Sequence, residues 1–143
     1  MNIDSIRNGI VIDHIAAGKG MTLYRLLGLD DLECSVALIK NVSSRKMGKK
    51  DIIKIDSDFD VDTAILGYVD PDVTVNVIRE GKITEKKAIG LPEELVNVLT
   101  CKNPRCITTT EQELTQIFRL TDLTHRVYRC LYCEAEAASS GTE

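Results

Sequence analysis

The sequence lacks the features that would mark a membrane or secreted protein. Its 143 residues contain no tryptophan, only two phenylalanines and only two histidines. No stretch approaches the ~20 apolar residues that a membrane-spanning helix needs. The first residues, Met1 to Ser5, show neither the basic start nor the apolar core of a secretion signal. We therefore expect a cytoplasmic protein with no membrane contact.

Motifs of enzymes are missing as well. No nucleophile stands beside a candidate base, no paired catalytic carboxylates are evident, and the phosphate-binding pattern Gly-x-x-x-x-Gly-Lys does not occur. The formal net charge of −4 argues against a protein whose main task is to bind nucleic-acid phosphates. These absences favour a non-catalytic module that binds a ligand or a protein partner.

Four of the five cysteines form two close pairs. Cys101 and Cys106 make the first pair, and after 23 further residues Cys130 and Cys133 make the second. This spacing predicts a closed four-thiolate site for one structural zinc ion, because soft thiolates in a tetrahedral set favour zinc. Two disulfides or unpaired buried thiols are the alternatives. The fifth cysteine, Cys34, lies in an apolar run and is expected to be a buried strand residue.

The cysteine segment is too short to fold on an apolar core alone, since chains below ~40 residues usually need a metal or disulfides. Metal binding is therefore expected to supply much of its folding free energy. His125 is a weaker alternative ligand, five residues before Cys130. A zinc ribbon that binds nucleic acid is the main rival interpretation. It would need a basic face studded with aromatic residues, which this acidic chain does not offer.

Hydrophobic periodicity predicts alternating strands and helices before the cysteines. We expect strands over residues 9–15, 35–41, 51–56, 73–77 and 83–89, and helices over residues 21–27 and 61–68, the second capped by Asp60. A further short helix is expected from Pro92 to Leu99. The fold class is then α+β: an antiparallel sheet with two helices on one face, a ferredoxin-like sandwich, followed by a small β-rich zinc-binding domain. The expected domains are residues 1–93 and 98–143.

Several charged and polar residues stand on or beside the expected strands. Lys50, Lys54 and Lys86 supply positive charge, and Asp13, His14 and Asn76 supply hydrogen-bonding groups. Together they could hold a small anion such as a nucleotide. Two ordinary interpretations stay open: His14 as a hydrogen-bonded histidine at a strand end, and the basic residues 45–50 as a solvated loop.

Beyond these patterns, four separated segments carry a likeness to a known family. They are Gly9 to Ile15, Met47 to Ile55, Thr74 to Ile78, and the spacing of Cys101, Cys106, Cys130 and Cys133. In this order, from Ile3 to Glu134, the chain resembles the regulatory chain of aspartate carbamoyltransferase. The resemblance implies a non-catalytic subunit in pyrimidine biosynthesis. Its N-terminal domain would bind the nucleotide effectors CTP, ATP and UTP and form homodimers, and its zinc domain would dock on the catalytic chain.

The resemblance also implies roles for particular residues. The nucleotide site would comprise Asp4, Ile6, Val11, Asp13, His14, Lys54, Asn76, Ile78 and Lys86, with the two lysines facing the phosphates and Asp13 bonding the base. Contacts to the catalytic chain would come from Asn103, Tyr132 and Glu134. One position departs from the family pattern: Gly81 stands where some members have an aromatic residue, so a ribose or base contact is expected to be missing there.

Overall fold

The chain divides after Gly90 into two compact units, each built around its own antiparallel sheet. The computed structural model describes residues 6–137. None of the helices in this described part is long and apolar enough to cross a membrane. Because the division falls after Gly90, the segment that leads to the first cysteine belongs to the second unit.

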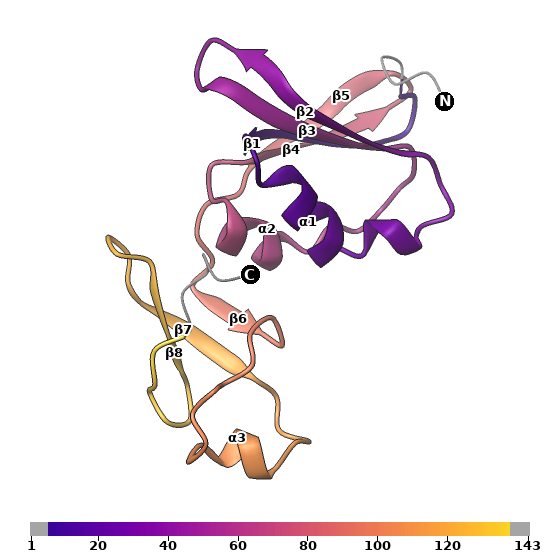
Figure 1. Cartoon of the computed structure of the whole chain (residues 1–143). Coiled ribbons are helices and arrows are strands. Elements are labelled where there is room, and N and C mark those ends of the chain that lie inside the picture. Colours follow the sequence, from indigo (N-terminus) through magenta and orange to yellow (C-terminus); the bar gives the residue numbers. More distant parts are fainter. Residues whose placement is uncertain (1–5, 138–143) are drawn as a thin grey trace. The chain divides into compact units, whose positions relative to one another are not determined.

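The N-terminal unit contains five antiparallel strands in the order β2-β3-β1-β4-β5 (Figure 1). The first four strands follow the ferredoxin-like order, and β5 extends the sheet beyond β4, so the predicted fold class is confirmed. The elements are β1 (Gly9–Ala16), α1 (Gly20–Leu26), η1 (Leu29–Asp31), β2 (Val36–Ser44), β3 (Gly48–Ile55), α2 (Thr63–Val69), β4 (Thr74–Arg79) and β5 (Lys82–Ala88).

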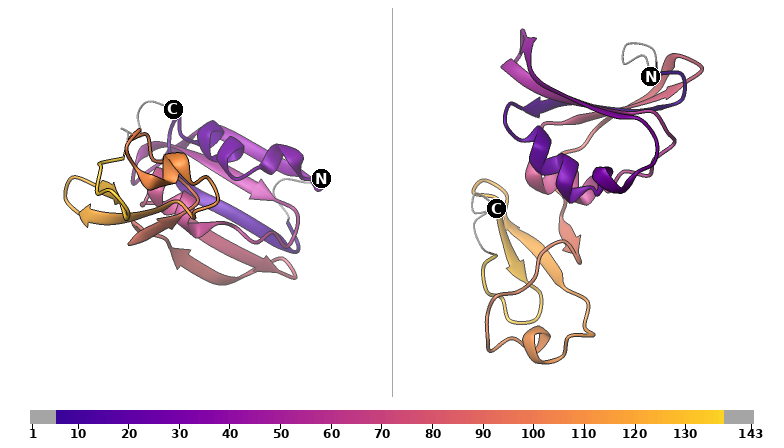
Figure 2. Two further views of the ribbon diagram at one scale, coloured as in Figure 1. Left: turned by 90° about the horizontal axis from the view of Figure 1, so that it is seen from below. Right: turned by 45° about the vertical axis from the view of Figure 1, so that its right-hand side comes forward.

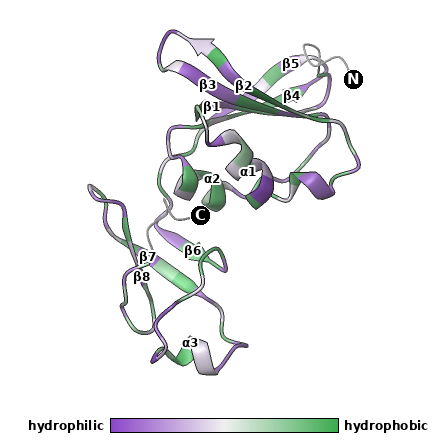
Figure 3. Ribbon diagram, in the orientation of Figure 1, coloured by the Kyte–Doolittle hydropathy of each residue, from purple (hydrophilic) through white to green (hydrophobic). Residues whose placement is uncertain are grey.

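Both α-helices cover the same face of this sheet and leave its other face open (Figures 1 and 2). Ile12, Ile53 and Ile55 project from the strands into the covered side, where Leu23 of α1 and Leu66 of α2 meet them, all fully buried. Hydrophobic residues accordingly run along the central part of the sheet (Figure 3). Each such side chain contributes about 1.5–3 kcal/mol by leaving water, so this layer holds the unit together.

One buried carboxylate organises the edge of this core. Asp51 of β3 has no exposed surface, and its Oδ2 accepts hydrogen bonds from the backbone N–H groups of Gly18 and Gly20 at 3.1 and 3.0 Å. Its Oδ1 accepts the N–H of Asn41 at 3.0 Å. A Cβ at Gly20 would lie 2.8 Å from Asp51 Oδ2, so only glycine allows this approach. Asp51 thereby joins the β1–α1 loop to the bulge in β2.

The second helix begins two residues later than the sequence pattern predicts. Asp62, in an extended conformation, caps α2 by accepting the N–H groups of Ala64 and Ile65 on its Oδ1 at 3.0 and 3.2 Å. The prediction that Asp60 is the cap is wrong. Aspartates alternate from residue 56 to residue 62, and the one that caps is fixed by the helix turn that buries Leu66.

The C-terminal unit is a three-stranded sheet in the order β6-β7-β8 with one short helix. Its elements are β6 (Glu94–Val96), α3 (Ile107–Thr110), β7 (Ile117–Asp122) and β8 (Val127–Cys130). Leu95, Phe118 and Tyr128, one from each strand, are buried together with three of the cysteines. The Tyr128 hydroxyl also donates to the Pro92 carbonyl at 2.6 Å. The predicted small β-rich domain is confirmed.

The predicted helix from Pro92 to Leu99 is wrong, because this segment contains strand β6. Leu95 pairs with Phe118 in the ladder and is fully buried, while its neighbours Glu94 and Val96 are exposed. Proline followed by two glutamates is typical of a helix start, yet this segment pairs with β7 and buries Leu95. Tertiary pairing of a three-residue strand outweighs the weak local preference for helix.

Candidate functional sites: a metal centre and a polar sheet face

The four predicted cysteines converge on one point of the C-terminal unit. Their sulfur atoms all lie within 4.8 Å of one another. Cys101 Sγ lies 3.7 Å from Cys133 Sγ, and Cys106 Sγ lies 3.7 Å from Cys130 Sγ. Both distances far exceed the ~2.05 Å of a disulfide bond, and all five cysteines are free thiols.

This spacing fits a tetrahedral metal ion. Metal–sulfur bonds of ~2.3 Å, the value for zinc, require sulfur atoms ~3.8 Å apart at the corners of a tetrahedron. Two sulfur–sulfur distances of 3.7 Å meet that requirement closely. Four thiolates close the shell and leave no position for a reacting water, so the arrangement suits a structural ion.

Two tight turns present the thiols. In the first, the Asn103 carbonyl accepts the N–H of Cys106 at 3.0 Å, and its side-chain Oδ1 accepts the N–H of Arg105 at 3.1 Å. The second follows β8, where the Cys130 carbonyl accepts the N–H of Glu134 at 2.8 Å. Glu134 adopts a left-handed conformation with φ of 64°. Each turn folds its pair of thiols toward one point.

The protonation of the thiols depends on their surroundings. Burial raises the pKa of Cys101 to about 12 and also raises the pKa of Cys130. A hydrogen bond from the Asn103 side chain lowers the pKa of Cys133 to about 7. Since a metal binds thiolates, an ion must displace the protons that burial holds on Cys101 and Cys130.

The residues predicted to contact a partner lie around these turns. Tyr132 is 40 % exposed and its hydroxyl donates to the Thr115 carbonyl at 3.0 Å, while Glu134 is exposed. Asn103 is half-buried; its side chain accepts the N–H of Arg105 within the turn and forms a hydrogen bond with the Cys133 thiol. His125 is not in the sulfur cluster; its Nδ1 lies 2.8 Å from the Asp122 carboxylate on the exposed β7–β8 turn.

Cys34 lies just before β2 rather than within a strand. It is half-buried and packs against the core of the N-terminal unit. The expectation of a buried strand residue is therefore wrong in position, because the ladder with β3 begins only at Val36.

Four residues of the predicted nucleotide site form one row across the open face of the other sheet. Val11 in β1 lies opposite Lys54 in β3 on one side and opposite Asn76 in β4 on the other. Asn76 in turn lies opposite Lys86 in β5. Lys54 stands between the buried residues Ile53 and Ile55, so alternation directs it to the face that the helices leave open.

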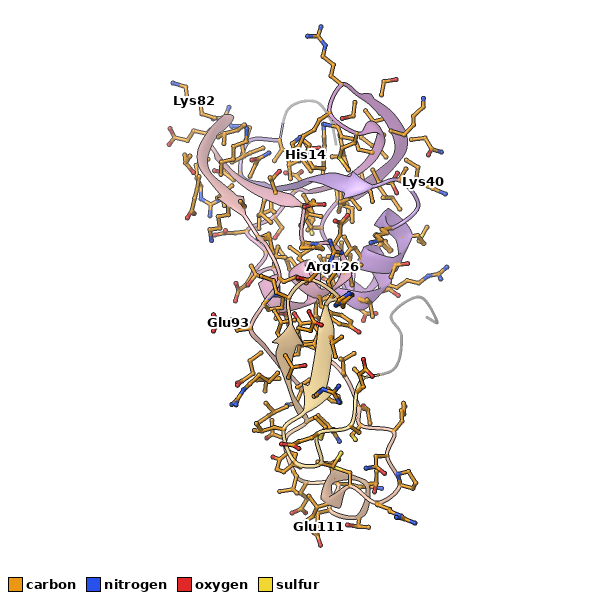
Figure 4. All side chains as sticks on the ribbon, turned by 90° about the vertical axis from the view of Figure 1, so that its left-hand side faces the viewer. His14, Lys40, Lys82, Glu93, Glu111 and Arg126 are labelled. Carbon is orange, nitrogen blue, oxygen red and sulfur yellow. The ribbon has the colours of Figure 1, made fainter. Side chains whose placement is uncertain are left out.

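A bulge in β1 adds Asp13 and His14 to the same face. The ladder between β1 and β3 shifts register between Ile12 and Ile15, and His14 has a left-handed φ of 62°. His14 Nδ1 lies 3.0 Å from the Thr74 hydroxyl of β4 (His14 is labelled in Figure 4). Such bulges re-aim side chains beside functional sites.

Asp13 carries a charge on this face. It forms an ion pair of 2.9 Å with Lys50. Burial raises the pKa of Asp13, but the hydrogen bonds from the Lys50 ammonium and the His14 N–H outweigh burial, and the pKa is lowered overall.

The remaining predicted nucleotide-site residues are placed as follows. Ile78 lies opposite Gly9 on the open face, and Ile6 is buried against Gly9. Asp4 lies outside the described residues. Asn76 is 7 % exposed, and its Oδ1 is a buried oxygen with no hydrogen-bond partner among the described residues. An acceptor of this kind costs free energy unless a ligand or water satisfies it.

Comparison with known proteins accounts for both units. Residues 1–90 match the family model described as "Aspartate carbamoyltransferase regulatory chain, allosteric domain", and residues 93–141 match the model described as "Aspartate carbamoyltransferase regulatory chain, metal binding domain". The chain belongs to the family of aspartate carbamoyltransferase regulatory chains. The resemblance predicted from the sequence is confirmed, and the family places the chain among regulatory, not catalytic, subunits.

Curated relatives agree with this assignment. The aspartate carbamoyltransferase regulatory chain of Clostridium botulinum strain Hall is 48% identical over 134 residues, which cover 94% of this chain and 92% of that protein. The regulatory chains of Bifidobacterium longum and Clostridium tetani are each 47% identical, over 137 and 135 residues, covering 96% and 94% of this chain and 99% and 94% of theirs. The metal-binding family model spans all four cysteines of the cluster.

The conformation of the turn at Gly81 favours glycine. Glu80 and Gly81 connect β4 and β5 with φ values of 53° and 79°, which is the pattern of a two-residue hairpin turn with left-handed residues. An aromatic residue at Gly81 would be strained in this conformation. The Gly81 N–H also donates to the Arg7 carbonyl at 2.9 Å, so the turn is tied to the segment before β1.

Thr74 and Gln116 are among the residues that contribute to the sites without having been predicted as site residues. Thr74 bonds His14, and it carries no charge or motif that would single it out. Gln116 accepts the N–H of Cys101 on its Oε1 at 3.1 Å from a position 15 residues away. Only the folded register of the strands brings these residues to the sites.

Proposed function

We propose that the chain is a non-catalytic regulatory subunit of aspartate carbamoyltransferase in cytoplasmic pyrimidine biosynthesis. It binds nucleotide effectors of the CTP, ATP and UTP class on the open face of the N-terminal sheet. It forms a homodimer through its N-terminal domain and docks on the catalytic chain through the metal-binding unit, which carries one structural zinc ion. Family membership supports the regulatory role.

The observation that carries the effector site is the row of Lys54, Val11, Asn76 and Lys86 across four neighbouring strands. Two lysines bracket a half-buried apolar residue and a buried amide whose oxygen has no hydrogen-bond partner within residues 6–137. Cations at the ends suit phosphate groups, and the amide suits a polar edge of a base or ribose. Asp13 and His14, beside the row, add a second set of hydrogen-bonding groups.

Control of the catalytic chain then requires an effector that binds the two states of the complex with different affinity, because equal affinity shifts no equilibrium. Coupling of this kind is typically about 1–3 kcal/mol. Lys86 lies in β5, and the chain reaches β6 of the metal-binding unit shortly after β5 ends. A ligand that draws Lys86 toward Lys54 would pull on this connection.

The identity of the metal as zinc is inferred from the ligand type as well as from the geometry of the cluster, since four thiolates favour soft or borderline metals. Exposed Tyr132 and Glu134, with Asn103 beside them, are the proposed contacts to the catalytic chain. They border turns that metal ligation holds in place, so docking would depend on the ion.

Calorimetric titration of the zinc-loaded chain with CTP, ATP and UTP tests the effector site. We expect micromolar to millimolar binding that Lys54→Ala or Lys86→Ala abolishes. Lys87→Ala is the matched control. Lys87 lies opposite buried Val75, so its side chain projects from the face of β5 opposite to that of Lys86, and it forms an ion pair of 3.8 Å with exposed Glu85. No binding of any nucleotide by the folded wild-type chain would refute the effector site.

A separate experiment tests docking. Removal of zinc from the assembled complex by a chelator or a mercurial should release the catalytic trimer, which sizing chromatography detects. A complex that stays intact after complete loss of zinc would refute metal-dependent docking while leaving the effector site unaffected.

A further inference from the structure

Thr108 is one of four buried polar or charged residues in the described part of the chain, with 3 % of its surface exposed. It lies in the short helix α3, two residues after Cys106. Its hydroxyl oxygen is 3.1 Å from Cys106 Sγ, which is close for a contact between oxygen and sulfur. A buried hydroxyl needs a partner, and here that partner is a metal-ligating sulfur.

Metal ligation fixes the direction of this hydrogen bond. In the thiol form either atom can be the donor. A metal-bound thiolate has no proton, so the Thr108 hydroxyl must donate and the sulfur must accept. Four thiolates around a divalent ion carry a net charge of about −2, and a donor aimed at one of them disperses part of that charge.

The other thiols obtain their hydrogen bonds differently. Cys101 accepts the backbone N–H of Asn103, and Cys130 accepts the N–H groups of Tyr132 and Cys133. Cys133 accepts the side chain of Asn103 and the N–H of Ala135. The backbone donors in these turns are present whichever side chains the donor residues carry. Cys106 instead lies against the Thr108 hydroxyl, which a point substitution can remove.

From this geometry we propose that Thr108 is a positioning residue of the metal centre: its hydroxyl donates to the Cys106 thiolate, orients it toward the ion and strengthens metal binding. This inference rests on the proposed metal-bearing function of the unit. Outer groups that orient metal ligands generally contribute ~10–100-fold to metal affinity, and Thr108 holds such a position.

The neighbouring threonine supplies an internal control. The Thr109 hydroxyl lies 2.6 Å from the Cys106 carbonyl and 3.1 Å from the Pro104 carbonyl, in the same helix turn. It therefore bonds backbone oxygens and not a sulfur. Substitution of Thr109 perturbs the same turn without removing a hydrogen bond to a ligand sulfur, which separates a general effect on α3 from a specific effect on the Cys106 thiolate.

The test compares Thr108→Val, Thr108→Ser and Thr109→Val in the full chain. Zinc affinity is measured by competition with a chromophoric chelator, and the thiolate-to-metal charge-transfer bands are recorded with Co²⁺. Thr108→Val should weaken zinc binding ~10–100-fold and shift the Co²⁺ bands. Thr108→Ser keeps the hydroxyl and should retain the zinc affinity and the Co²⁺ bands of the wild type. Thr109→Val should leave the bands unchanged, with a zinc affinity within ~3-fold of wild type.

Each outcome is decisive. Wild-type affinity and spectrum in Thr108→Val would overturn the inference, as would an equal loss in Thr109→Val. If Thr108→Val does not fold at saturating zinc, wild-type binding by Thr108→Ser supports the hydroxyl, and failure of both variants refutes it. A wild-type chain that binds no metal would refute the proposed metal-bearing unit itself, a result distinct from a silent Thr108.

Discussion

The two units of this chain reach stability by different means. The N-terminal unit buries a cluster of eleven apolar residues between its sheet and helices. In the C-terminal unit the buried hydrophobic set is Leu95, Phe118 and Tyr128 with three cysteines. The first can fold by removing apolar surface from water, whereas we expect the second to depend on ligation of its thiols.

The same contrast applies to function. The open sheet face of the N-terminal unit carries charged and polar groups that the apolar layer beneath them holds in register. In the metal-binding unit, the groups proposed for docking lie on turns that the thiols define. Ligand binding on the first unit can therefore change without loss of fold, while loss of the ion should abolish the docking surface altogether.

Removal of the metal should produce the largest difference between the two units. Structural zinc sites contribute apparent binding free energies of about 10–16 kcal/mol, so a chelator should unfold the C-terminal unit and leave the N-terminal unit folded. Hydrogen exchange with mass spectrometry checks this: amides of β7 and β8 should lose protection, and those of β1 and β3 should keep it. Persistent protection in β7 after complete removal of metal would contradict the expectation.

Truncation of core side chains should also affect the two units differently. Leu66→Ala should destabilise the N-terminal unit by about 2–5 kcal/mol and Phe118→Ala the C-terminal unit by about 3–5 kcal/mol, from lost transfer energy and cavity formation. Only Phe118→Ala should also weaken metal binding, because folding and ligation are linked there. Urea unfolding and metal competition measure the two effects. Leu123→Ala, at a side chain 68 % exposed, is the control and should change neither.

The metal affinity of the C-terminal unit should depend on pH. Burial raises the pKa of Cys101 to about 12 and raises that of Cys130, so both thiols hold protons at neutral pH in the metal-free chain. Binding must release at least these two protons, and affinity should fall about 100-fold for each unit by which pH drops. Competition titrations between pH 6 and pH 8 measure the slope. A slope below tenfold per pH unit would contradict these protonation states.

The smallest effect is expected at the Asp13–Lys50 ion pair. The pKa of Asp13 is lowered in the folded chain, so its contribution to stability is present above the unfolded pKa and is lost as pH falls through the folded value. Asp13→Asn should cost no more than about 1 kcal/mol at pH 7 and nothing once pH is low enough to protonate the carboxyl. Urea midpoints measured from pH 7 down to pH 2 test this. An unchanged difference across this range would show that charge is not the cause.

Much of this molecule follows from local pattern. Cysteine spacing predicted the thiol cluster, and the spacing of apolar residues predicted the five strands and two helices of the N-terminal unit and the α+β class. Side chains two residues apart leave the same face of a strand whatever surrounds them. Lys54, between two isoleucines that the helices cover, is therefore recognisable as a residue of the open face from the sequence alone.

Other features depended on partners far along the chain. The strand at Leu95 exists because Phe118 pairs with it, and Asp51 is a buried acceptor because Gly18, Gly20 and Asn41 meet at it. Local preference at these positions is weak, and burial or pairing contributes several kcal/mol that no neighbouring residue encodes.

The order of amino acids specifies the chemical groups that the chain carries: four thiols for one ion, and lysines with polar groups at alternating strand positions. Which of these residues share a site depends on the fold. Strand register set the row from Lys54 to Lys86, and the turn into α3 brought Thr108 onto Cys106. Sequence patterns act over a few residues, whereas a site forms where segments distant in the chain bury their surfaces together.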